Sequence, residues 1–292
     1  MLWIPITVAA TVFQVGRNAS QRSLLAAAGP WGATLARFLF GLPFAVLFLV
    51  LDLLIQPQAA PQPDGRFFLA CALGAAGQIL ATAAMLVSMR RSSFALGTVF
   101  QQSSIPLAGL IGLLLGEPLG AWRWVGLAMV SLGLAALGWP RRASTQRLGS
   151  AALLGLCAGA GFAVSSNAVR AATLSFDRHA PVYAALAALV VTQTMQSVAL
   201  GGWLLLRDRA ALRALGQGWR ASLPAGFFGA AASALWFTAF ALAPAGPVRA
   251  VGVTEAPLAA LAGRRLFAER LHLWQAGLMA LIAAGVVLAA LG

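Results

Sequence analysis

Long apolar runs separated by short polar turns are the dominant pattern of this chain. The ten runs cover residues 2–25, 31–54, 67–88, 93–115, 121–139, 148–169, 180–206, 221–242, 247–263 and 271–291. Each run is long enough for a membrane-spanning helix, and the alternation typical of a membrane barrel is missing. The turns contain helix breakers such as Gly29-Pro30. The pattern predicts an all-α integral membrane protein with ten transmembrane helices.

Composition supports this prediction, because 60% of the residues are hydrophobic and only 9% are charged. The net charge of +13 results from 20 basic residues, all of them arginine and most of them between the apolar runs, against seven acidic residues. Such arginines are typical of loops that face anionic lipid, so the expected partners are membrane lipid and a small-molecule substrate, not nucleic acid. Cys71 and Cys157 fall inside apolar runs without metal-binding spacing, and we expect no metal or cofactor. The expected state is a monomer or homodimer.

The two halves of the chain resemble each other. Four of seven residues in 13–19 recur in 162–168, at an offset of 149. At an offset of 152, Glu117, Trp122 and Gly133 recur as Glu269, Trp274 and Gly285. The predicted organisation is a first five-helix repeat at 1–140, an Arg-rich linker at 141–147 and a second repeat at 148–292. Five is an odd number, so the second repeat enters the membrane inverted, as in many secondary transporters.

An ordered set of short motifs resembles the EamA-type branch of the drug/metabolite transporter superfamily across nearly the whole chain. These motifs are Gly16 with Asn18, Arg37-Phe38, Pro106 with Gly116-Glu117, Pro257 with Glu269, and the late glycines Gly133 and Gly285. The resemblance implies ten helices in two repeats and transport of a small metabolite. Its members carry amino acids, sugars, nucleotide sugars, phosphates, cations or drugs. The chain departs from the family at Val15-Gly16-Arg17, where a Trp-Gly pair is common, and at Glu255, which is not a general family feature.

The arginines are distributed unequally between the two sides of the predicted bundle. The odd-numbered turns hold Arg22, Arg90, Arg91, Arg141, Arg142, Arg147, Arg207, Arg209, Arg213, Arg220, Arg264, Arg265 and Arg270. The other side holds Arg66, Arg123, Arg170, Arg178 and Arg249. The positive-inside rule therefore places the odd-numbered turns in the cytoplasm and both termini outside the cell (plasma or inner) membrane. The family resemblance implies the opposite orientation.

Glu255 is the carboxylate predicted nearest the centre of the membrane. It lies eight residues after Pro247, which is about 12 Å along a helix and close to the middle of a ~30 Å hydrocarbon core. A carboxyl group there is costly unless it is neutral, paired or facing water. We therefore expect Glu255 to carry protons or to bind a cationic substrate group. The alternative is a structural carboxyl that holds helices together.

Other polar side chains within the runs are candidates for the same site. Arg17 and Arg37 either extend to the interface or bind Glu255 or an anionic substrate group. The amides Asn18, Asn167, Gln101 and Gln102 are expected to face the bundle interior, as interhelix contacts or substrate ligands. Trp236 is expected to pack in the core or to stack on a substrate.

These features together favour a secondary transporter, an exporter or exchanger, for a small polar or amphipathic metabolite. It would work by alternating access and couple to protons through Glu255. The alternative is a membrane-embedded enzyme or a flippase for lipid-linked substrates. No nucleophile with a neighbouring base and no paired catalytic carboxylates are visible, so no catalytic residues are predicted.

Overall fold

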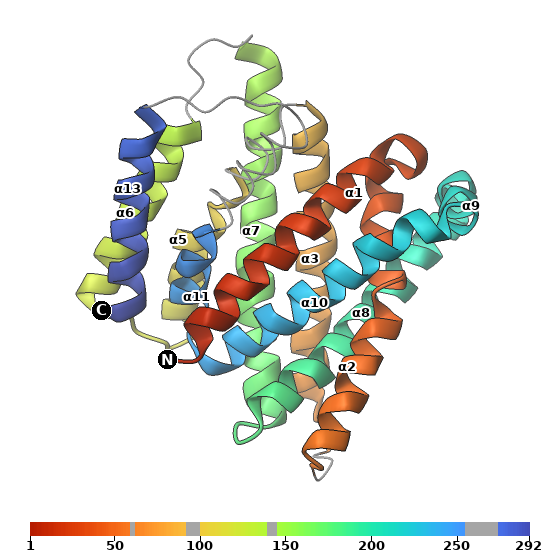
Figure 1. The fold of residues 1–292 in the computed structure, drawn as a ribbon, viewed down its shortest axis with the longest axis horizontal. Helices are drawn as coiled ribbons and strands as arrows, with labels where there is room; N and C mark the ends of the chain where they lie inside the picture. Colours follow the sequence, from red (N-terminus) through yellow and green to blue (C-terminus); the bar gives the residue numbers. More distant parts are fainter. Residues whose placement is uncertain (59–61, 92–99, 139–144, 255–273) are drawn as a thin grey trace. The chain divides into compact units, whose positions relative to one another are not determined.

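The computed structural model describes residues 1–58, 62–91, 100–138, 145–254 and 274–292, and in these ranges the chain is all-α (Figure 1). The helices are α1 (Trp3–Leu39), α2 (Leu42–Ile55), α3 (Gly65–Arg91), α5 (Ser104–Leu114), α6 (Ala121–Gly138), α7 (Thr145–Phe176), α8 (Pro181–Arg207), α9 (Arg209–Gln217), α10 (Trp219–Leu242), α11 (Ala245–Val251), the 3-10 helix η1 (Gly252–Thr254) and α13 (Trp274–Leu291). The described residues contain no strand, which confirms the predicted all-α class.

Five helical segments of the described residues are long and apolar enough to cross a membrane. They are Trp3–Ile55, Gly65–Arg91, Gly149–Phe176, Pro181–Arg207 and Trp219–Leu242. Large apolar side chains such as Leu54, Leu69 and Val198 are exposed on the outside of these helices. An apolar surface of this extent suits lipid and not water. The chain is therefore an all-α membrane protein, as its hydropathy predicts.

The N-terminal segment reverses direction at Gly29-Pro30. Gly29 has φ 65° and ψ 179°, a conformation outside the helical region that glycine adopts without strain. Gln21 donates a hydrogen bond through its side-chain nitrogen to the carbonyl of Ala33 at 2.9 Å. Twelve residues of straight helix would separate these groups by about 18 Å. The chain therefore folds back, and the two predicted runs at 2–25 and 31–54 are separate helical pieces.

The second run contains a local irregularity. α1 ends at Leu39 and α2 begins at Leu42, with a turn at Phe40 and Gly41 whose backbone angles stay in the right-handed helical region. The physical reason is Pro43, which has no N–H for the Leu39 carbonyl and disfavours the preceding helical turn.

The fourth run, predicted as an unbroken helix over 93–115, is interrupted. Gln102 and Ser103 form a turn before α5 begins at Ser104. Pro106 has no N–H for the Gln102 carbonyl. Ile105 donates to that carbonyl instead, at 3.0 Å. The backbone therefore forms a tighter turn, with a hydrogen bond three residues apart, at the two glutamines that the sequence predicts as site residues.

Residues 209–217, predicted as part of an Arg-rich turn, form the helix α9. Asp208 caps it, with one carboxylate oxygen accepting a hydrogen bond from the backbone N–H of Ala211 at 3.1 Å. Ala211 and Leu215 are buried four residues apart on one face. A Cβ built on Gly32 of α1 would contact the Ala211 methyl at 3.4 Å. Because the helix covers the chain just beyond the Gly29 reversal, tertiary packing stabilises a segment that its charge predicts to be a loop.

The described chain forms two compact units, and each takes segments from both predicted halves. Unit 1 comprises Met1–Ile79 and Ser165–Leu242, and unit 2 comprises Leu80–Val164 and Ala243–Gly292. In unit 1, α1 packs along α10, with the ring of Phe13 6.3 Å from that of Phe227. A Cβ built on Gly16 of α1 would lie 3.0 Å from the Phe228 ring, so the two helices approach closely.

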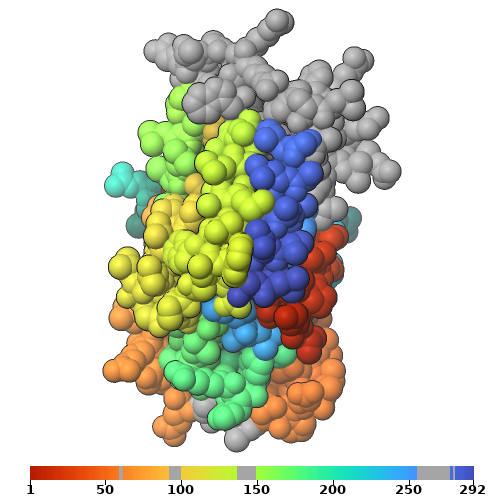
Figure 2. All heavy atoms as spheres, turned by 90° about the vertical axis from the view of Figure 1, so that its left-hand side faces the viewer, coloured from red at the N-terminus to blue at the C-terminus, as the bar shows by residue number. Residues whose placement is uncertain are grey.

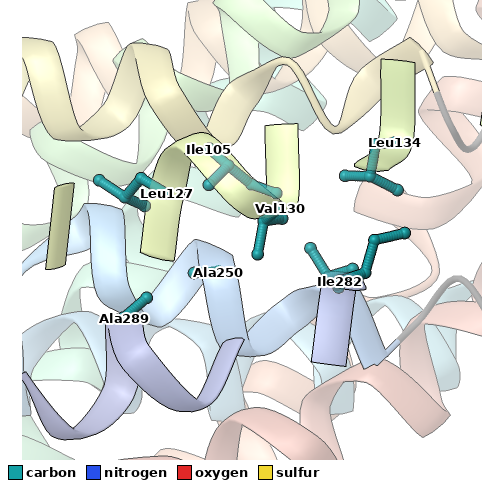
Figure 3. Packing of buried hydrophobic residues seen from close by; sticks show 8 residues of the cluster. Ile105, Leu127, Val130, Leu134, Ala250, Ile282 and Ala289 are labelled. Atoms are coloured by element: carbon teal, nitrogen blue, oxygen red, sulfur yellow. The ribbon is translucent and has the colours of Figure 1, made fainter. Parts of the chain in front are cut away.

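In unit 2, α6 and α13 lie side by side (Figures 1 and 2). Leu127, Val130, Ile282 and Ala289 from these helices form a buried cluster with Ile105 of α5 and Ala250 of α11 (Figure 3). The two helices are antiparallel, because Gly126 contacts Ala289 while Gly133 contacts Ile282.

Contacts between α6 and α13 are reciprocal at the offset of 152. A Cβ built on Gly133 would lie 2.6 Å from Ile282 Cγ1 and 3.6 Å from the Leu278 carbonyl oxygen. A Cβ built on Gly285 would lie 2.9 Å from both Val130 Cγ2 and the Gly126 carbonyl oxygen. Residues 130 and 126, advanced by 152, are 282 and 278. Gly133 therefore contacts residues 278 and 282, whereas Gly285 contacts residues 126 and 130. The two sets of contacts are equivalent at the offset of 152.

Candidate polar binding site

Arg37 is the centre of a buried polar cluster in unit 1. The side chain is only 2% exposed. Its Nη2 donates hydrogen bonds to Gln78 Oε1 of α3 and to Ser233 Oγ of α10, both at 3.0 Å. Its Cζ lies 5.0 Å from the centre of the Phe38 ring. The guanidinium is thus held inside the protein, so Arg37 does not extend to the interface, one of the two alternatives that the sequence leaves open.

Two glutamines of α8 continue this cluster. Gln196 Nε2 donates to Gln78 Oε1 at 3.3 Å and to the Ala75 carbonyl at 3.4 Å. Its Oε1 is buried without a hydrogen-bond partner among the described residues. Gln193, one turn earlier in α8, is 1% exposed. Neither Oε1 nor Nε2 of its side-chain amide has a hydrogen-bond partner among the described residues. Below, the Arg37 cluster means Arg37, Gln78, Gln193, Gln196 and Ser233.

A stripe of small residues on α10 makes room for Arg37. A Cβ on Gly229 would lie 2.6 Å from Arg37 Cγ, and a Cβ on Gly226 would lie 2.5 Å from the Phe40 carbonyl carbon. Gly226, Gly229 and Ser233 share one face of the helix at spacings of three and four residues. None of these three residues is among the site residues predicted from the sequence. The available signal was the spacing of small residues, which lets helix backbones approach in membrane proteins.

The Arg37 cluster presents several kinds of hydrogen-bonding group in one place. A guanidinium offers five donors, and each amide offers two donors and an acceptor. Burying an amide without hydrogen bonds costs about 1–3 kcal/mol. The side-chain amide of Gln193 and the Oε1 atom of Gln196 can therefore gain hydrogen bonds from a polar group of a ligand. A ligand with a carboxylate, phosphate or amide has the matching chemistry.

Arg17 and Asn18 form a second buried pair in α1. Both side chains are buried, and Arg17 donates through Nε and Nη2 to Asn18 Oδ1 at 3.0 and 2.7 Å. Like Arg37, Arg17 has its head group inside the protein and not at its edge. Asn167 in α7 is buried as well, so both asparagines of the predicted repeat face the interior.

Trp236 packs in the core of unit 1. Its Nε1 donates to Gln14 Oε1 at 2.8 Å, and its ring stacks on Phe240 at a centroid distance of 5.6 Å. The side chain is buried. Of the two alternatives, the geometry favours packing, because Phe240 occupies one face of the indole.

The remaining predicted site residues fall elsewhere. Gln101 and Gln102 are buried in unit 2, at the turn before α5. Gly155 and Gly159 of α7 pack closely against Phe100 and the turn at 101–104. Glu255 and its neighbour Pro257 lie outside the described residues, so the placement of this carboxylate stays a prediction. In the described ranges, no group of three or more His, Cys, Asp or Glu side chains forms a potential metal site.

Fold and site together define an all-α membrane protein with a polar cluster inside an apolar helical unit. No family model matches the chain, and no curated protein matches it. A solved structure described only as a crystal structure of a protein is similar, with a TM-score of 0.68 and 19% sequence identity over 100% of this chain and 96% of that chain. At this identity the similarity shows the fold alone.

Proposed function

We propose that the protein is a secondary transporter that moves a small polar or amphipathic metabolite by alternating access. The observation that carries the proposal is the Arg37 cluster, in which polar side chains of α1, α3, α8 and α10 meet between apolar helices. Ionisable residues inside membrane proteins are expensive to bury and mark substrate or ion pathways. Substrate therefore binds, in this proposal, where the guanidinium and the two α8 glutamines converge.

Reciprocal contacts between α6 and α13 support an architecture of two inverted five-helix repeats. Gly133 and Gly285 exchange equivalent contacts across an antiparallel helix pair at the offset of 152. A local two-fold axis between inverted copies produces this exchange. The resemblance to EamA-type transporters is consistent with the same arrangement. The Trp3–Ile55 segment has 53 residues, far more than the ~20 that one crossing needs, so in this proposal it crosses twice. The predicted runs at 93–115, 121–139, 247–263 and 271–291 then supply the four spans that bring the total to ten.

Interrupted helices give further support to a transport function. Phe40-Gly41 lies one turn after Arg37, and Gln102-Ser103 carries one of the predicted site glutamines. Secondary transporters build their sites from discontinuous helices, whose free backbone groups bind substrates and ions. Near Arg37, Pro43 has no N–H for the Leu39 carbonyl, which therefore lacks its helical donor.

Proton coupling through Glu255 is part of the proposal and rests on the sequence. Five of the seven acidic residues, Asp52, Asp64, Glu117, Asp177 and Asp208, are described, and each lies near a helix end or in a connection. Glu255 is the remaining carboxylate that lies within an apolar run. A carboxyl that alternates between protonated and ionised states couples substrate movement to a pH gradient.

A ligand screen followed by transport in liposomes tests the function. Purified protein is screened by thermal shift against amino acids, sugars, nucleotide sugars, phosphates, cations and amphipathic drugs. Compounds that raise the unfolding midpoint are then assayed for uptake into proteoliposomes with and without a pH gradient. We expect gradient-driven accumulation by the wild type and only exchange by Glu255→Gln. Uptake no faster than into protein-free liposomes, for every stabilising compound, would refute a transport function, and equal accumulation by both proteins would remove Glu255 from the mechanism.

A further inference from the structure

Helix α9 connects the ends of two apolar helices and carries exposed positive charge. It lies between α8 and α10, both long and apolar enough to cross a membrane. A nine-residue helix at such a connection lies at the membrane surface, because only the adjoining helices have the length to cross the hydrocarbon core. This end of unit 1 is therefore expected at the depth of the lipid headgroups.

Four exposed arginines define this face: Arg207, Arg209, Arg213 and Arg220, below called the α9 arginine face. Arg209 and Arg213 are four residues apart on one helix, so their side chains are neighbours at about 6 Å. The carboxylate in this stretch is Asp208, which accepts the capping hydrogen bond from Ala211. The four arginines outnumber this single carboxylate, so the face keeps a net positive charge.

Packing holds the arginines outward. Ala211 and Leu215 are buried on the side of α9 that covers Gly32. The apolar side of this amphipathic helix is thus fixed to the protein, and its charged side faces away. The guanidinium of Arg220 also lies 5.3 Å from the centre of the Trp219 ring, a distance that suits cation–π attraction.

Apolar and aromatic side chains surround the α9 arginine face. Trp203 and Trp219 are 42% and 46% exposed, and Leu206 is 80% exposed. Tryptophan rings favour the depth of the headgroups, and an exposed leucine favours the acyl chains. A free anion in water offers no partner for these groups, whereas a lipid offers both a phosphate and hydrocarbon.

We propose that the α9 arginine face binds the headgroups of acidic phospholipids and that this binding stabilises unit 1. Arginine guanidinium groups pair with phosphate oxygens through two parallel hydrogen bonds. The stabilisation reaches the chain reversal at Gly29-Pro30, since Gly32 of α1 packs on Ala211 of α9. The proposal is independent of transport, because it concerns a surface away from the Arg37 cluster in sequence and uses none of its residues.

Thermal unfolding of the full-length protein in neutral detergent tests this binding. The protein is titrated with dioleoyl phosphatidylglycerol, with dioleoyl phosphatidylcholine or with inorganic phosphate. We expect the acidic lipid to raise the unfolding midpoint of the wild type more than the zwitterionic lipid does, and phosphate to have little effect. Each arginine near a charged membrane surface contributes roughly fivefold to affinity. The double variant Arg209→Gln/Arg213→Gln should therefore need roughly 25-fold more acidic lipid for the same shift.

The matched control is Arg66→Gln/Arg178→Gln. Both arginines are exposed: Arg66 directly precedes Phe67 in α3, and Arg178 lies just before α8. The ring contacts Phe67–Phe176 and Phe176–Tyr183 place both arginines near the start of α8. Helix α9 follows the opposite end of α8. The control removes the same charge and should keep the wild-type response. An equal loss in the control, an equal shift with phosphatidylcholine, or full stabilisation by phosphate alone would overturn the proposal.

Two measurements do not depend on the folding of the glutamine variants. Arg209→Lys/Arg213→Lys keeps the charge and should retain most of the lipid response. For the wild type, raising NaCl to about 0.5 M should remove most of the response to acidic lipid, because charge–charge attraction at a surface is screened. A response that is unchanged by salt would contradict charge-based lipid binding.

Discussion

At the scale of single residues, Arg37 donates hydrogen bonds to two neutral side chains of the described part of the chain. Its Nη2 donates hydrogen bonds to Gln78 and Ser233, and Gly229 leaves space for the aliphatic part of its side chain. A guanidinium holds five N–H donors in a fixed planar geometry. Lysine keeps the charge but lacks the fork. Arg37 is thus the residue at which geometry and charge can be separated experimentally.

Arg37→Lys is expected to lower the transport rate at least roughly tenfold, which corresponds to about 1.4 kcal/mol of lost substrate binding. The charge-assisted bonds to a substrate require the guanidinium geometry. Uptake into proteoliposomes measures the effect, and the matched control is Arg178→Lys, an exposed arginine before α8. Wild-type transport by Arg37→Lys would show that Arg37 serves packing and not substrate binding.

Gln193 provides a second residue-level prediction. Its buried amide has no hydrogen-bond partner among the described residues, whereas Gln196 bonds Gln78. Gln193→Met keeps the volume and removes the unpaired polar group, so the free energy of unfolding should be unchanged or rise by about 1 kcal/mol. Gln196→Met should lower it by a similar amount. Both changes are measured by thermal unfolding without ligand.

In the presence of a stabilising substrate, Gln193→Met should lose part of the ligand-induced shift of the midpoint. A variant that is destabilised as much as Gln196→Met would indicate that Gln193 is hydrogen-bonded in the membrane-embedded protein. A variant with a full substrate shift would place Gln193 outside the binding site.

At the scale of elements, small residues and prolines decide how helices meet. Glycines allow the close contact between α6 and α13, and Pro43 and Pro106 accompany the turns before α2 and α5. At Gly126, a Cβ would collide with the backbone of Ala289 and lie 2.6 Å from the Gly285 carbonyl oxygen. Backbone atoms cannot rotate away, so this contact requires glycine.

Gly126→Ala is expected to destabilise the protein by about 1–3 kcal/mol, because α6 and α13 must separate to admit one methyl group. The matched control is Gly277→Ala on α13, where a Cβ would meet nothing within 4 Å. There, alanine should be neutral or stabilising by up to about 1 kcal/mol, from its higher helix propensity. The unfolding midpoints of both variants in detergent are the measurement. Similar unfolding midpoints for the two variants would mean that α6 and α13 pack less closely than the contacts of Gly126 indicate.

At the scale of the whole molecule, the two compact units do not coincide with the two predicted repeats. Each unit combines a segment of the first half with a segment of the second. Repeats that contribute to shared units cannot bury their apolar surfaces separately. The linker at 141–147 thus joins two halves of sequence without being a boundary between the compact units.

Orientation in the membrane is a prediction at this scale. A periplasm-active reporter fused after Gly292 should be active, and one inserted at Gly218, between α9 and α10, should be inactive. The reason is the excess of arginine in the odd-numbered turns, which include the α9 arginine face. Reporter activity in intact cells is the measurement. The reverse pattern would support the orientation implied by the family resemblance and leave the fold unchanged.

The sequence by itself determined the helical class, the membrane environment and the approximate positions of most helices. Long apolar runs leave a backbone in lipid no alternative to internal hydrogen bonds, so helix formation follows from hydropathy alone. The burial of Asn18 and Asn167 also follows, because polar groups avoid lipid. These properties depend on local composition, which the chain carries at every position.

Tertiary structure alone decided which polar groups meet. The sequence proposed Arg37 but gave no reason to join it to Gln78 and Ser233, which lie 41 and 196 residues away. Nor did it predict α9, whose helix is stabilised by a cap and by packing on Gly32. Hydropathy indicates that a face is buried but not against what, because every apolar helix surface is an acceptable partner for another. The backbone contacts allowed by Gly226 and Gly229 make that choice, and they exist only once the helices have packed.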